Sequence, residues 1–150
     1  MRIGALLVLV FVGCTQASPA GDLFAPDTTE VSIRRTGGLA PTPGGGSTCA
    51  PMDNRYVLEV STHVLSWQFC EAPASDAVYS LVANNKALSA ADYDELAAAL
   101  HGLTTVEAVC AGDIVDEIAF STPAGQSTFD HANCLGNEAA VFAVLDAVAR

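Results

Sequence analysis

Basic residues are scarce in this sequence. Six lysines and arginines stand against seventeen aspartates and glutamates, which gives a formal net charge of −11. Proteins that bind nucleic acid carry clustered positive charge, so this composition argues against a nucleic-acid partner. It also argues against a protein surface attracted to anionic lipid headgroups. The acidic residues are spread singly along the chain, a pattern typical of a solvated protein surface.

Sequence motifs for catalysis are missing as well. The chain has no Gly-x-Ser-x-Gly, no His-Glu-x-x-His and no glycine loop followed by the lysine of a phosphate site. Its three histidines, His63, His101 and His131, are not spaced as metal ligands on one helix face. The sequence therefore predicts a protein that is not an enzyme and that holds no cofactor and no metal.

Two short clusters of reactive side chains suggest alternatives to this interpretation. Residues 130–134 contain a histidine and a cysteine, but a disulfide sulfur is neither a nucleophile nor a zinc ligand. We interpret that stretch as an exposed loop before a disulfide. Asp113, Asp116 and Glu117 suggest a calcium ion, but the apolar residues between them interrupt the alternating oxygen ligands of an EF-hand. We interpret these three residues as a solvated strand edge.

Residues 1–14 have the pattern of a secretory signal. Arg2 supplies an early positive charge, and an apolar run follows that is too short to span a bilayer stably. The stretch Phe11–Cys14 resembles the lipobox of bacterial lipoproteins. The resemblance implies removal of residues 1–13, lipidation of Cys14 and attachment to the outer membrane or cell surface through that lipid. The absence of Asp at Thr15 favours, by the same resemblance, the outer membrane.

The cysteine count supports this interpretation independently. Five cysteines are present, and lipidation of Cys14 leaves an even set in an oxidising compartment: Cys49, Cys70, Cys110 and Cys134. Four cysteines allow several pairings, which sequence alone does not distinguish. We favour Cys49–Cys70 and Cys110–Cys134, because each pair flanks a strand-like segment and closes a loop of moderate length. Buried free thiols, as in a cytosolic protein, are the alternative.

Hydrophobic alternation predicts a sheet after a flexible tether. Residues 14–28 are rich in small and polar residues and predict the tether, and residues 29–150 the folded domain. Glu30–Arg34 alternates as a half-buried strand, and residues 41–46 form a Pro- and Gly-rich loop. The strongest strand signal comes from two runs of alternating apolar residues that a short connection separates. The first run contains Tyr56, Leu58 and Val60, and the second contains Leu65, Trp67 and Phe69. Val78–Val82 is a candidate further strand, followed by a turn at Asn84 and Asn85.

Two helices and a second strand pair complete the prediction. Ser89 can cap a helix whose apolar stripe ends near Gly102, and Asn137 can cap a helix over 138–149. Between them, 114–120 and 127–130 alternate as strands around a Pro-Gly turn. This order predicts one small α+β domain, with an antiparallel sheet of four to five strands, two helices packed on it and disulfide cross-links.

One place concentrates positive charge on this acidic chain. Arg34 and Arg35 precede Gly37 and Gly38 beside the loop of residues 41–46. A loop held by a rigid scaffold is a common site of recognition, so these residues are the predicted binding site. The alternative is that the two arginines protect an edge strand from pairing with other chains.

The stretch Val31–Gly38 resembles the opening strand and Gly-Gly of emfourin-type proteins. In that family a Leu-rich helix, an Asp-led strand pair and a closing helix follow, and here Ser89–Leu103, Asp113–Asp130 and Glu138–Val148 occupy those places. The resemblance implies a small proteinaceous inhibitor of thermolysin-like metalloproteases, but it assigns no inhibitory residue. The cysteine-bounded segments are also similar to uncharacterised secreted bacterial lipoproteins.

The sequence thus predicts a cell-envelope lipoprotein whose domain binds another protein, with metalloprotease inhibition as the specific form that the resemblance implies. The alternatives are a structural or scaffolding lipoprotein without an enzyme target, and a weak hydrolase or metal-binding module. Expected partners are the membrane, through the lipid, and a protease or other envelope protein.

Overall fold

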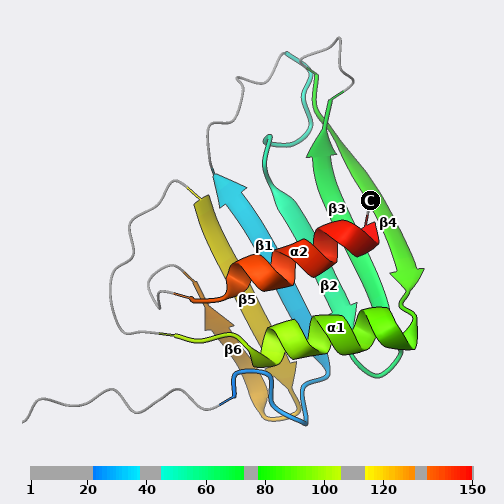
Figure 1. Cartoon of the computed structure of the whole chain (residues 1–150). Coiled ribbons are helices and arrows are strands. Elements are labelled where there is room, and N and C mark those ends of the chain that lie inside the picture. The colour runs from blue at the N-terminus through cyan, green and yellow to red at the C-terminus, as the bar shows by residue number, and fades with distance from the viewer. Residues whose placement is uncertain (1–21, 38–44, 73–77, 106–113, 131–134, 150) are drawn as a thin grey trace, which may run out of the picture.

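The computed structural model describes residues 22–37, 45–72, 78–105, 114–130 and 135–149. The described elements form one antiparallel sheet with two helices on one of its faces (Figure 1). In chain order they are β1 (Glu30–Gly37), β2 (Asn54–Glu59), β3 (Val64–Glu71), β4 (Ser80–Ala87), α1 (Ala90–His101), β5 (Ile114–Thr122), β6 (Gly125–Phe129) and α2 (Glu138–Ala149). The strands lie in the order β4-β3-β2-β1-β5-β6.

The predicted alternation forms the centre of the sheet. Tyr56 and Leu58 on β2 are buried while their neighbours are exposed, and Leu65, Trp67 and Phe69 repeat the pattern on β3. The two strands pair as the predicted hairpin, with His63 at a positive φ of 54° in the connection. Because side chains alternate across a strand, these five buried residues lie on the face that the helices cover.

Both helices begin near the predicted residues. The Ser89 hydroxyl accepts a hydrogen bond from the Asp92 backbone N–H at 3.2 Å and caps α1, and Gly102 follows the end of that helix. Asn137 directly precedes α2, but its φ is 65° and its side-chain amide donates to the Gly102 carbonyl at 2.8 Å. Asn137 therefore ties the start of α2 to the end of α1.

The core lies between the helices and the covered face of the sheet. The residues with almost no exposed surface come from both layers: Val31, Leu58, Leu65, Ile118, Leu96, Leu100, Val141 and Leu145. Phe24, which lies in the segment predicted as a tether, packs against this core and is 5% exposed. Burial of such side chains at roughly 25 cal/mol per Å² of apolar surface is the main force that holds the layers together.

The Cys49–Cys70 disulfide is present, as predicted. It joins the loop before β2 to the end of β3, and the adjacent Thr48 N–H donates to the Tyr79 carbonyl near the start of β4. The bridge therefore fastens the loop that precedes β2 to the β3–β4 end of the sheet. Cys110 and Cys134 lie outside the described residues, as do Cys14 and Gly38.

The α+β prediction with an antiparallel sheet and two helices is confirmed, but the sheet has six strands rather than four to five. The turn predicted at Asn84 and Asn85 is wrong, because both residues lie within β4 and pair with Trp67 and Ser66 of β3. The edge-strand alternative for Arg34 and Arg35 is also wrong, because β1 lies between β2 and β5.

The disulfide yields the first testable prediction. Replacing Cys49 and Cys70 together by serine should lower the free energy of unfolding by about 3 kcal/mol, because the unfolded chain loses a cross-link that spans 21 residues. Urea unfolding of the double variant and of the parent protein measures the difference. An unchanged unfolding midpoint would contradict the role assigned to the bridge.

Candidate functional site

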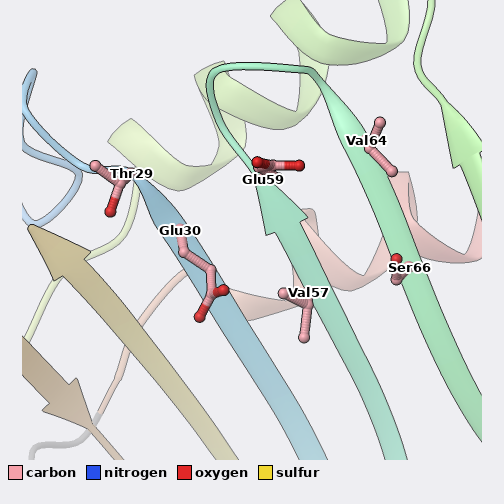
Figure 2. Close-up of a pocket in the computed structure, with 6 residues that line it drawn as sticks. All are labelled: Thr29, Glu30, Val57, Glu59, Val64 and Ser66. Atoms are coloured by element: carbon pink, nitrogen blue, oxygen red, sulfur yellow. The ribbon is translucent and has the colours of Figure 1, made fainter.

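The helices leave one face of the sheet uncovered, and we call this the open face. Figure 2 shows side chains of β1, β2 and β3 that project from it, with the helices passing behind the sheet. The strand pairing sets these side chains in rows that run across the strands. Ser32 of β1 lies opposite Val57 of β2, and Val57 lies opposite Ser66 of β3. These three residues, all short, form the floor of a shallow trough.

Longer side chains stand on both sides of that floor. One hollow of about 380 Å³ is lined by Thr29, Glu30, Val57, Glu59, Val64 and Ser66. A second hollow, of about 260 Å³, is lined by residues that include Val57, Ser32, Arg34, Arg55 and Glu117. Val57 lines both hollows, so they lie next to each other on the open face. We name the two together the trough.

The first wall of the trough is acidic. Glu30 and Glu59 lie directly opposite each other on β1 and β2. Like charges in this position destabilise a pair of strands. Their carboxylates accept hydrogen bonds from Ser32 at 3.3 Å and from Thr62 at 2.8 Å, but no lysine or arginine in the described residues forms an ion pair with either. A cation placed on this wall would relieve the repulsion.

The second wall is a network of charges. Asp53 accepts bidentate hydrogen bonds from Arg34, at 3.0 and 3.2 Å, and from Arg55, at 3.3 and 3.0 Å. The hydrogen bond from Arg55, and then that from Arg34, lower the pKa of Asp53 to about 2, although burial opposes the shift. Glu117 lies opposite Arg34 on β5 and forms no ion pair within the described part of the chain. One carboxylate thus holds both arginines.

Arg35 points to the other face of the sheet. Its guanidinium donates two hydrogen bonds to Asp116 of β5, at 2.7 and 2.8 Å, and lies 3.5 Å from the centre of the Phe142 ring of α2. The hydrogen bonds that Arg35 donates to Asp116 raise the pKa of Arg35. The interpretation of Asp116 as a solvated residue is therefore wrong: this carboxylate is half-buried and helps to join β1, β5 and α2.

The structure separates the residues of the predicted binding site. Arg34 lies on the open face, Arg35 lies on the covered face, and Gly37 ends β1 with a φ of 93°. The guanidinium groups of Arg34 and Arg35 already form ion pairs with carboxylates of this chain. Binding of a partner by the predicted site residues stays a prediction. The acidic wall was missed, because the register that brings Glu30 beside Glu59 is a tertiary feature. The only available signal was that both residues are polar positions of amphipathic strands.

The described histidines have structural contacts. His63 stacks on Tyr93 of α1 with ring centres 3.6 Å apart, and a ring nitrogen of His101 lies 2.6 Å from a carboxylate oxygen of Asp22. Across the described residues, no group of three or more His, Cys, Asp or Glu side chains is arranged to hold a metal ion. Neither described helix has the length and apolar character to cross a membrane. His131 and Asp113 lie outside the described residues.

Comparisons with known proteins give no match to a family model, to a curated protein or to a solved structure. The geometry of the open face is therefore the basis for a functional argument.

The two arginines should respond differently to a conservative change. Arg35→Lys removes the bidentate hydrogen bonds to Asp116 and the contact with Phe142, so it should lower the free energy of unfolding by about 1–2 kcal/mol. Arg34→Lys is the matched control, and it should cost no more than about 0.5 kcal/mol because its pair with Asp53 is exposed. Urea unfolding at neutral pH measures both, and equal effects would contradict the structural role given to Arg35.

Proposed function

We propose that this chain is a lipid-anchored protein of the bacterial cell envelope that binds another protein through the trough on its open face and catalyses no reaction. The signal-like residues 1–13 and the lipobox-like Cys14 support the location. Attachment through lipid leaves the folded domain free to contact a partner. The disulfide between Cys49 and Cys70 suits an oxidising compartment.

The repulsive pair Glu30 and Glu59 is the observation that carries the binding proposal. The two carboxylates face each other across β1 and β2, beside a floor of short side chains. Glu117 adds a further carboxylate with no cationic partner among the described residues. The partner is therefore a segment that presents lysine or arginine to the first wall and a small or apolar side chain to Val57.

The distance between the walls is adequate for such a segment. Glu30 and Arg34 are four residues apart on one extended strand, which corresponds to roughly 13 Å along β1. This spacing exceeds the diameter of an extended backbone and is comparable to that of an α-helix, about 10 Å. A peptide can thus lie across the strands without displacing the charges of either wall.

A pair of variants with equal change in charge tests the proposal. A peptide that alternates lysine and alanine should bind about tenfold more weakly to the double variant Glu30→Gln/Glu59→Gln, since two exposed charge pairs are each worth up to about 1 kcal/mol. The control is Asp94→Asn/Glu95→Gln on the exposed face of α1, which removes the same net charge and should leave the affinity within about twofold. Isothermal titration calorimetry at physiological salt measures both. An equal loss in the two variants would contradict a site in the trough, because it would reduce the binding to general attraction.

The resemblance of Val31–Gly38 to emfourin-type proteins supports one partner class, a thermolysin-like metalloprotease. A molar excess of the full chain should inhibit such a protease, and the double variant Glu30→Gln/Glu59→Gln should inhibit it less. Full protease activity at large molar excess would remove this partner class. The alternative, a scaffolding lipoprotein without an enzyme target, would then be the form of protein binding to pursue.

A further inference from the structure

The outer edge of β4 has no neighbouring strand in the described part of the chain. All eight residues of β4 are exposed, although the strand pairs with β3 along its whole length, from Val64 opposite Ala87 to Glu71 opposite Ser80. The outward N–H and C=O groups of an edge strand form a template for one more strand. The other edge strand, β6, is shorter, with five residues, and mostly polar.

The edge of β4 lacks most of the features by which proteins prevent such pairing. Natural edges carry proline, bulges, several charges or very short strands. β4 has one charge, Lys86, whose ammonium lies 4.0 Å from the Asp92 carboxylate of the same chain. It also exposes apolar side chains, since Leu81 and Val82 are 53% and 45% exposed.

Charge selects a second copy of this chain as the occupant of that edge. The net charge of −11 makes two copies repel each other over most of their surfaces. Neither edge strand contains an aspartate or glutamate, and β4 is the longer and more apolar of the two, so two copies can approach along it without bringing strand carboxylates together. Two identical strands that pair antiparallel around a twofold axis are self-complementary, and closed twofold symmetry is the commonest symmetry among soluble homo-oligomers.

We propose that two copies associate through antiparallel pairing of their β4 strands, centred on Val82. In this register Val82 faces Val82 of the second copy, and Leu81 faces Ala83. The Lys86 side chains are kept at opposite ends of the contact. A register centred on Ala83 places Leu81 against Asn85, and one centred on Asn84 places Val82 against Lys86. Of these three registers, the one centred on Val82 pairs the most apolar surface.

This pairing joins the two sheets into one. The twofold axis is perpendicular to the sheet, so both open faces lie on the same side of the dimer. Two troughs then point in one direction, and a partner with two basic segments, or two partners side by side, can bind at once. Such bivalent binding raises the apparent affinity without any new contact. This consequence rests on the proposed function, whereas the dimer itself does not.

Sedimentation equilibrium of the mature full chain in density-matched detergent tests the dimer. The parent protein should shift from monomer to dimer as its concentration rises. Val82→Lys and Leu81→Lys should weaken the association at least tenfold, because each places two like charges within the contact. Val57→Lys is the matched control, because Val57 is an exposed valine on the open face. It should dimerise as the parent does, and circular dichroism and thermal melting check that every variant is folded.

The outcomes separate this proposal from the proposed function. A parent protein that stays monomeric at the highest concentration, or a Val82→Lys variant that dimerises as the parent does, would overturn the β4 contact. Loss of the dimer in Val57→Lys alone would also overturn it and would place the contact on the open face.

The register has its own test: Val82→Cys should form an intermolecular disulfide on oxidation and Asn85→Cys should not. Cross-linking of Asn85→Cys in place of Val82→Cys would overturn the Val82-centred pairing.

Discussion

Burial of only one face of the sheet is the constraint on which the rest of this structure depends. Leu96 and Leu100 of α1, with Val141 and Leu145 of α2, fill the space over the centre of the sheet. An antiparallel sheet tolerates this arrangement, because its strands can present apolar residues to one side and polar residues to the other. The open face and the exposed β4 edge both follow from it: two helices do not cover both faces, and they leave every residue of β4 exposed.

Ion pairs and a disulfide then join neighbouring parts of this fold. Arg35 links β1 to β5 through Asp116 and contacts α2 through Phe142. The disulfide holds the loop before β2 against the end of β3. On the open face, by contrast, Glu30 and Glu59 face each other without a cation from the described residues. Arg35, which supports the fold, is thus paired, whereas Glu30, Glu59 and Glu117 beside the trough form no ion pair within the described residues.

Much of the fold could be predicted because its signals are local. The alternation of Tyr56 and Leu58, the cap at Ser89 and the turn before Gly125 each depend on a few neighbouring residues, and the structure contains all three. β4 was missed in part because Asn84 and Asn85 carry strong turn propensity, which pairing with β3 overrides. The turn preference of two residues stabilises the chain less than a complete ladder of backbone hydrogen bonds does.

The candidate site was harder to predict, because it depends on register. Arg34 and Arg35 are adjacent in sequence but lie on opposite faces, so one lines the trough and the other supports α2. Glu30 and Glu59 are far apart in sequence and become neighbours only when β1 pairs with β2. A shift of one residue in that pairing would place one of the two glutamates on the covered face. No local pattern contains this information.

The central proposal is that the open face binds a protein partner in the cell envelope. Carbodiimide labelling of carboxylates, applied to the chain in intact envelopes and to the purified protein, tests it most directly. The account predicts that Glu30 and Glu59 react more slowly in the envelope than in the purified protein, while Asp94 and Glu95 on α1 react at the same rate in both. Equal rates for Glu30 and Glu59 in the two preparations would contradict the account.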